Sequence, residues 1–291
     1  MIEEYLQKLQ QTLLANHYDD VENAIDYIME CIEDKKEEGC SEQEILDAFG
    51  TVEAMASSIT GKQVKPAITS YAIKHIITEL TNTDLEITES ECFNVEVNYP
   101  DNGNYDVHEE GDTLYIKEKK TGRSFFSFSR KIIISLPKDY PLSTLKITAA
   151  TSDTLLYHIF VSDVQVQADC GDLHMEDCFL SHVDITAKSG DLEIEKGSLE
   201  QGTLHTASGD IHIEDCSLGT VSITAASGDV SIEESDLLHL DISTHSGDIE
   251  LDLPCEEEQY TIHKNHETTG TGSKQITLKT ASGDIDIDFA Y

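Results

Sequence analysis

Basic residues are scarce in this chain of 291 residues. It contains 19 Lys and Arg against 57 Asp and Glu, so its formal net charge is −38. Nucleic-acid binding requires a footprint of Lys and Arg, and an anionic membrane surface also attracts basic segments. The charge therefore argues against both kinds of partner. Hydrophobic residues make up 38% of the chain, which is too much for a fully disordered acidic protein.

Long hydrophobic runs are also missing. No stretch approaches the roughly 18 apolar residues that a membrane-spanning helix needs. The opening residues 1–5 carry no basic region and no apolar run follows them, so a secretory signal is not expected. We therefore expect a cytoplasmic protein that has no membrane span and associates with a membrane only through a partner.

Paired cysteines are a third absence. The seven cysteines are odd in number and form no Cys-x-x-Cys motif, so we expect neither a disulfide framework nor a zinc ribbon. Cys178 and Cys216 stand at equivalent positions two units apart in the repeat described below, roughly 9.6 Å at strand spacing. A disulfide needs Cα atoms closer than about 7 Å, so free thiols are predicted at both positions.

Residues 1–62 predict a module of four helices. Apolar residues recur at helical spacing over residues 2–14 and 21–32. Ser41 and Glu44 have the spacing of a capping box at the start of a third helix, and a short fourth helix follows. Four amphipathic helices in so short a stretch predict a compact bundle.

A resemblance to a known family rests on three segments of this module: Glu3–Leu9, Glu37–Gly39 and Ser41–Glu53. The module resembles the helical HAAS domain found at the start of many bacterial membrane-linked regulatory proteins. Those proteins commonly continue into transmembrane helices, whereas this sequence contains no such stretch. The resemblance implies a regulatory setting.

A 19-residue repeat is the strongest signal in the sequence. Gly-Asp recurs from Gly171 to Gly247 in equal steps (190 − 171 = 19) and once more at Gly283. Each repeat contains two short segments in which apolar and polar residues alternate, as in strands with one buried face. A single repeat cannot bury its apolar face, but stacked repeats can. Residues 151–291 therefore predict a right-handed parallel β-solenoid, and the whole chain an α+β fold.

Turn chemistry explains the repeated Ser-Gly-Asp. Glycine can adopt a positive φ at a sharp corner, and Ser and Asp side chains can bond neighbouring backbone amides. All five prolines lie outside residues 142–253, where they would remove ladder donors. We expect structural turns at Gly171, Gly190, Gly209, Gly228, Gly247 and Gly283.

Residues 66–150 predict irregular strands that begin and cap the solenoid. A second resemblance rests on these strands, on the Leu136-Pro137 step with Leu142 beyond it, and on the Ser-Gly-Asp repeats. Residues 66–291 resemble the bacterial "putative adhesin" family of β-strand repeats, a domain of unknown function. The family has no shared catalytic or binding residues to carry over, and the resemblance implies a regulatory or envelope-associated setting.

Carboxylates dominate one predicted face of the solenoid. Positions 2, 4 and 6 of each repeat, counted from the glycine, point outward and hold 15 carboxylates in 18 places over the six repeats. One interpretation is a solvated surface that keeps the solenoid soluble. The other is a face that binds Ca²⁺ or a polybasic peptide or protein, centred on Asp191, Glu193, Glu195, Asp210 and Glu214. The candidate residues are Asp172, Glu176, Asp191, Glu193, Glu195, Asp210, Glu214, Asp229, Glu233, Asp248, Glu250 and Asp252.

Other patterns that could carry chemistry are weak. His174 and His212 lie two repeats apart, too far for one metal ion. A His-x-x-His at 263–266, next to Glu267, lies in an expected exposed loop and has no third ligand of suitable spacing. No catalytic triad or phosphate-binding loop is present. We therefore expect no catalytic residues and no cofactor, with Ca²⁺ as the one possible ion.

The expected function follows from these patterns. It is that of a non-enzymatic scaffold or interaction protein of bacterial regulatory or envelope-associated type, which binds a protein or a cationic partner. The alternative is a cation-dependent adhesin or a carbohydrate-active β-solenoid. Parallel β-helix enzymes that act on polysaccharides tend to need a basic residue near the chemistry, and residues 152–253 contain only Lys188 and Lys196.

Overall fold

The computed structural model describes residues 2–15, 18, 21–37, 39–49, 51–60, 72–98, 105–119, 130–254, 259–265 and 267–289. The predicted boundary between the helical module and the strands, at residues 62–66, lies outside this described part.

Four helices open the chain: α1 (Ile2–Ala15), α2 (Val21–Glu37), α3 (Glu42–Phe49) and α4 (Val52–Thr60). Their apolar faces form a core cluster of their own that includes Leu9 and Leu13 of α1. The predicted capping box forms at α3, because the Ser41 amide donates to Glu44 Oε2 at 2.8 Å and the Glu44 amide donates to Ser41 Oγ at 3.3 Å. Donation from the Ser41 amide lowers the pKa of Glu44.

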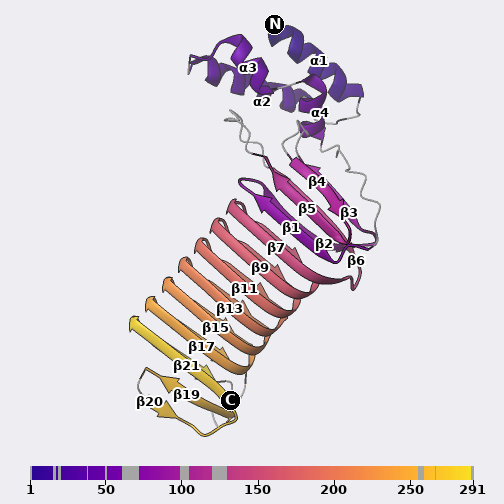
Figure 1. Ribbon diagram of the computed structural model, residues 1–291. Helices are drawn as coiled ribbons and strands as arrows, with labels where there is room; N and C mark the ends of the chain where they lie inside the picture. Colours follow the sequence, from indigo (N-terminus) through magenta and orange to yellow (C-terminus); the bar gives the residue numbers. More distant parts are fainter. Residues whose placement is uncertain are drawn as a thin grey trace.

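Two long sheets make up the rest of the described chain (Figure 1). Sheet A has the order β20 (Glu267–Thr269), β19 (Tyr260–Lys264), β21 (Lys274–Ser282), β17 (Asp236–Ser246), β15 (Ser217–Ser227), β13 (Ser198–Ser208), β11 (Phe179–Ser189), β9 (Phe160–Cys170), β7 (Pro141–Thr151), β1 (His75–Leu80), β5 (Thr113–Glu118) and β4 (Tyr105–Glu110). Sheet B has the order β22 (Ile285–Phe289), β18 (Ile249–Leu253), β16 (Val230–Glu233), β14 (Ile211–Glu214), β12 (Leu192–Glu195), β10 (Leu173–Glu176), β8 (Thr154–Tyr157), β2 (Asp84–Ser90), β6 (Lys131–Pro137) and β3 (Asn94–Asn98).

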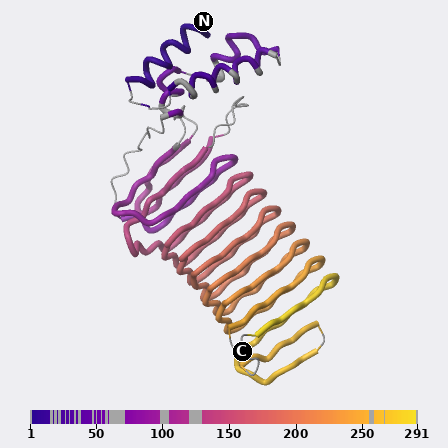
Figure 2. Tube along the Cα trace, turned by 180° about the vertical axis from the view of Figure 1, so that it is seen from behind, coloured from indigo at the N-terminus to yellow at the C-terminus, as the bar shows by residue number. Residues whose placement is uncertain are grey.

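Each turn of the coil, here called a rung, contributes one strand to each sheet (Figure 2). Neighbouring rungs pair in parallel, so that Leu173 lies beside Leu192 in sheet B and Leu180 beside Leu199 in sheet A. The apolar side chains of both sheets meet in one continuous core cluster. The predicted parallel sheets after an N-terminal helical segment are therefore confirmed, and the chain is mostly β.

Each rung has two strands, as predicted, but the strand in sheet A is not short, because most rungs contribute an eleven-residue strand there. In β11, Leu180, Val183 and Ile185 are buried, whereas Ser181 and His182 between them are not. The two consecutive uncovered residues shift the inside–outside alternation by one and bend the strand around the core. Pairing continues on both sides of the bend, so the whole eleven-residue segment forms one strand.

The Ser-Gly-Asp corners are held by close stacking as well as by backbone conformation. Gly209 has a φ of 142°, and a Cβ at this position would lie 2.1 Å from the carbonyl oxygen of Gly190 in the rung below. Gly247 differs from the prediction, since its φ is outside the left-handed region, yet a Cβ there would lie 2.0 Å from Gly228 O. Contact between rungs therefore requires glycine even where conformation does not.

A second corner follows each sheet B strand, and its backbone conformation was not predicted. The residue at position 7 has a positive φ in five consecutive rungs, although none of these residues is glycine: His158, Asp177, Lys196, Asp215 and Glu234. Left-handed conformation at ordinary residues leaves no glycine signal in a sequence.

Both ends of the solenoid depart from the parallel repeat. At the N-terminal end, β4 pairs antiparallel with β5 and β3 pairs antiparallel with β6. At the C-terminal end, β20 pairs antiparallel with β19. Between β18 and β21 the chain makes an excursion, yet Asp284 regains the same contact with Asp248 that earlier rungs make 19 residues apart. Among the described helices, none combines the length and apolar character needed to cross a bilayer.

Candidate functional site

The predicted acidic face lies on the outside of sheet B. Leu173 and Met175 of β10 are buried, whereas His174 and Glu176 between them are turned outward. The register stacks equivalent positions, so that Glu176, Glu195, Glu214, Glu233 and Asp252 form one continuous column. The structure thus brings the predicted carboxylates together at strand spacing.

The aspartates of this face bond backbone amides, as turn chemistry predicts, but the amide belongs to the next rung and not to the same turn. Asp172 Oδ1 accepts the backbone amide of Asp191 at 2.9 Å, and Asp191 Oδ1 accepts that of Asp210 at 2.8 Å. The same contact runs through Asp229 and Asp248 to Asp284. We call this series the aspartate ladder. In the ladder, one oxygen of each carboxylate accepts the amide of the next rung. The carboxylates of the glutamate column have no such backbone bond, so they are the part of the face more available to a ligand.

Lys196 pairs only with the N-terminal part of the glutamate column, whereas His174 and His212 lie near Glu193 and Glu214. Lys196 Nζ lies 2.9 Å from Glu176 Oε1 and 3.4 Å from Glu195 Oε2, and the bond to Glu176 raises the pKa of Lys196. His174 Nδ1 lies 2.7 Å from Glu193 Oε2. Residues 197–253 contain no Lys or Arg at all. The part of the column on β14, β16 and β18 therefore has no Lys or Arg of its own, and it begins at Glu214, the last residue of the predicted centre.

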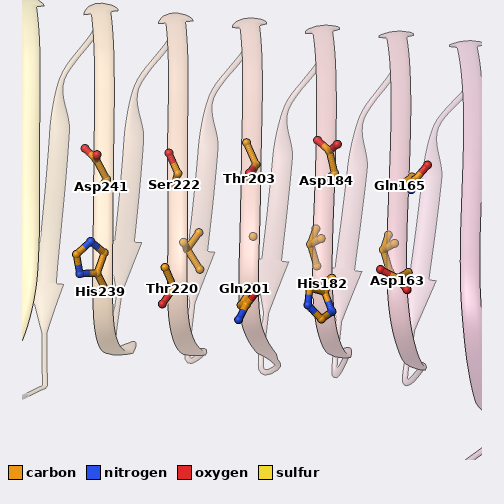
Figure 3. A pocket seen from close by; sticks show the side chains of 14 residues that line it. Asp163, Gln165, His182, Asp184, Gln201, Thr203, Thr220, Ser222, His239 and Asp241 are labelled. Carbon is orange, nitrogen blue, oxygen red and sulfur yellow. The ribbon is translucent and has the colours of Figure 1, made fainter.

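A polar hollow on the outer face of sheet A was missed by sequence analysis. It has a volume of about 610 Å³ and crosses five consecutive strands at the bend of each one (Figure 3). Two rows of side chains line it: Asp163, His182, Gln201, Thr220 and His239 form one, and Gln165, Asp184, Thr203, Ser222 and Asp241 the other. Within residues 163–241, which are all described, no Lys or Arg lines the hollow.

Gly202 lines the middle of this hollow. The neighbouring rungs place Val183 and Val221 beside it, and a Cβ on Gly202 would meet its nearest neighbour only at 3.7 Å. On each strand two outward polar positions flank one inward position, which is Val183, Gly202 or Val221 in the three central rungs.

Comparison with known proteins decides the family. The sequence pattern of Toastrack DUF4097 matches residues 73–288. The chain belongs to the Toastrack DUF4097 family. The family-level resemblance predicted for residues 66–291 is thereby confirmed.

One solved structure shows the same fold at low sequence identity, and others are similar over most of the chain. A crystal structure of a "putative adhesin" from Bacteroides fragilis is 16% identical, covers 75% of this chain and 94% of its own, and gives a TM-score of 0.52. Another "putative adhesin", from Parabacteroides merdae, is 14% identical, covers 79% of this chain and 97% of its own, and gives a TM-score of 0.49. The search of curated proteins found no match.

One cluster of possible metal ligands lies on the acidic face of this Toastrack chain. Ligand atoms of His174, Glu193 and Glu195 lie within 4.8 Å of one another. The hydrogen bond from His174 to Glu193 and the ion pair of Lys196 with Glu195 account for this arrangement without an ion. His263 bonds Thr268 Oγ1 at 2.9 Å, and His266 lies outside the described residues.

Cys178 and Cys216 of the Toastrack repeats are free and buried, so the predicted thiols are confirmed. Burial raises the pKa of Cys178 to about 12 and that of Cys216 to about 11. Cys178 Sγ donates to the carbonyl oxygens of Leu156 and Glu176, both at 3.4 Å. These thiols fill the second corner of their rungs as small apolar groups.

We expect the cysteines of the native protein to react with an alkylating reagent at different rates. A pKa of about 12 instead of 9.0 leaves Cys178 with roughly 1,000-fold less thiolate at pH 8, and burial slows its reaction further. Iodoacetamide labelling followed by peptide mass spectrometry should modify the exposed Cys92 and Cys170 first. Labelling of Cys178 as fast as Cys92 would contradict this assignment, and labelling after denaturation supplies the control.

Proposed function

We propose that this protein is a non-enzymatic interaction scaffold that binds a basic segment of a partner protein along sheet B. In this proposal, residues 151–291 are a right-handed solenoid of 19-residue rungs, residues 66–150 begin and cap it, and residues 1–62 form a separate four-helix docking module. The observation that carries the proposal is the continuous glutamate column over β14, β16 and β18, in a stretch without Lys or Arg.

Electrostatics favours a basic and extended partner. Like charges stacked on neighbouring strands repel one another, so a ligand that supplies Lys or Arg at strand spacing relieves that repulsion. A field of one sign also speeds the encounter with an oppositely charged segment, in a manner that salt weakens. The face keeps its shape on binding, because every rung is tied to the next by backbone bonds and by the aspartate ladder.

The comparisons support a binding role more than a catalytic one. The Bacteroides fragilis protein of the same fold is described as a "putative adhesin". The resemblance of the helical module to HAAS domains supports a regulatory or envelope-associated setting for this chain. Ca²⁺ is a further candidate occupant of the acidic face, since carboxylate oxygens are its preferred ligands.

Binding of a fluorescent dodecalysine peptide tests the proposal. The variant Glu214→Gln/Glu233→Gln/Asp252→Asn removes three charges from the column, and the matched control Glu3→Gln/Glu33→Gln/Glu53→Gln removes three exposed charges from the helices. Each lost pair is worth up to about 1 kcal/mol, so we expect affinity to fall roughly tenfold or more in the first variant and less than about twofold in the second. Equal losses would show attraction by net charge alone and would contradict a binding face on sheet B.

A second candidate function, glycan binding, rests on the polar hollow of sheet A. Its hydroxyl, amide, imidazole and carboxylate groups suit a hydroxyl-rich polymer lying along the solenoid axis, and its acidity disfavours anionic glycans. The variant Gly202→Val fills the floor with the residue found at this position in the adjacent rungs. Retention on a glycan array that Gly202→Val abolishes, without loss of thermal stability, would support this function. Turnover of a polysaccharide would sink the scaffold proposal.

A further inference from the structure

Three residues from separate segments meet at one corner near the N-terminal end of the solenoid. Glu89 lies near the end of β2, Asp139 in the turn between β6 and β7, and His158 in the turn between β8 and β9. Ligand atoms of the three side chains all lie within 4.8 Å of one another. Asp139 and His158 occupy equivalent corners (158 − 139 = 19) with φ values of 55° and 53°.

This corner differs from the regular ones because an extra strand enters it. In sheet A, β7 and β9 are direct neighbours (Figure 1), whereas in sheet B the strand order places β2 between β6 and β8. The register pairs Ile87 with Leu156, so the end of β2 runs alongside the chain that leads to His158. The inserted strand therefore brings Glu89 into a corner where successive rungs elsewhere have only their own two residues.

Glu89 Oε2 is shielded from solvent and has no hydrogen-bond donor among the described residues. Its neighbour is His158 Nε2, with which it forms an ion pair at 3.2 Å. Two ligands of one ion approach each other in this way: with bonds of about 2.0 Å, the edge of a tetrahedron is about 3.3 Å. The imidazole is also held in place, because its ring stands edge-on to Phe160 with centroids 5.8 Å apart.

The donor set selects the kind of ion. Imidazole nitrogen suits zinc and other transition metals, whereas Ca²⁺ and Mg²⁺ prefer oxygen ligands alone. We propose that Glu89, Asp139 and His158 bind one Zn²⁺ ion, with the fourth position open to water. The exposed Asp139 side chain completes the set by closing on the two half-buried ligands. This site is independent of the acidic face and joins the first regular rung to the strands that precede it.

Zinc titration of the full, untagged chain tests the proposal. A Cys92→Ser/Cys170→Ser background removes the two exposed thiols of the described residues, and a fluorescent zinc chelator competes for the ion. We expect one tight equivalent, with affinity reduced at least about tenfold by Glu89→Gln and by His158→Gln. The matched control is His174→Gln, which alters the histidine of the other cluster and should leave the affinity unchanged.

Two further readouts separate ligation from folding. Melting in EDTA shows whether a variant is folded, and the exposed Asp139→Asn changes a ligand without touching the core. Co²⁺ bound to the Cys92→Ser/Cys170→Ser parent should show the visible absorption of a low-coordinate site. The same absorption should be absent when His158→Gln is added to this parent. Absence of a stoichiometric equivalent in the parent, or loss of that equivalent in His174→Gln alone, would overturn the proposal.

Discussion

Gly209→Ala is expected to destabilise the solenoid by roughly 3–5 kcal/mol, among the largest effects of any single methyl group in this chain. The new Cβ would lie 2.1 Å from Gly190 O and 2.8 Å from its carbonyl carbon, and the φ of 142° is unfavourable for alanine. Backbone atoms on both sides cannot move aside without breaking the pairing of two rungs. Urea unfolding followed by circular dichroism measures the loss.

Gly202→Ala is the matched control, since it adds the same methyl group within β13, seven residues before Gly209 (209 − 202 = 7). Here the nearest atom would lie at 3.7 Å, an ordinary van der Waals distance, and φ is outside the left-handed region. Its stability should stay within about 0.5 kcal/mol of the parent. Equal effects of the two substitutions would mean that stacking of the glycine corners does not limit the fold.

Arg130→Met is expected to cost roughly 3–5 kcal/mol, because it leaves the buried Glu118 without its counter-charge. The side chains of Arg130 and Glu118 are 7% and 4% exposed, and Nη1 lies 3.1 Å from Oε1. Glu118 Oε2 also accepts the amides of Thr81 at 2.7 Å and Asn82 at 3.0 Å. The carboxylate thus fixes the turn between β1 and β2.

The neighbouring Lys117 provides the control for this ion pair. It pairs with Glu79, but the two side chains are more than half exposed, so Lys117→Met should cost no more than about 1 kcal/mol. In Glu118→Gln/Arg130→Met the amide oxygen still accepts backbone bonds while the charge is gone. This double variant should therefore be more stable than Arg130→Met; a lower unfolding midpoint would contradict a penalty from the unpaired charge.

The repeat made the solenoid predictable, because Gly-Asp spacing and alternating apolar residues recur where adjacent strands stack. The bend in sheet A was hidden, since Ser181 and His182 interrupt the alternation as a turn would. The pairing of Arg130 with Glu118 depends on how three preceding strands are arranged, which no local pattern encodes.

The residues of the acidic face were predictable from the sequence, but not which of them bond the backbone and which do not. Outward carboxylates follow from period-two alternation. That Asp191 holds an amide of the next rung, while Glu214 does not, depends on side-chain length and on the position of the corner. The polar hollow and the corner with Glu89 both arise where strands bend or are inserted, and such places break the period on which sequence analysis relies.

The excursion after Leu253 shows what the rungs tolerate. Thirty-six residues instead of 19 separate Gly247 from Gly283 (283 − 247 = 36), yet β18 and β22 pair in register and Asp284 still donates to Asp248 at 2.7 Å. The corner thus absorbs 17 additional residues (36 − 19 = 17) without displacing the next rung. Such a corner is a natural grafting point, where a foreign peptide could be displayed on a rod of fixed pitch and new functions could be acquired without rebuilding the scaffold.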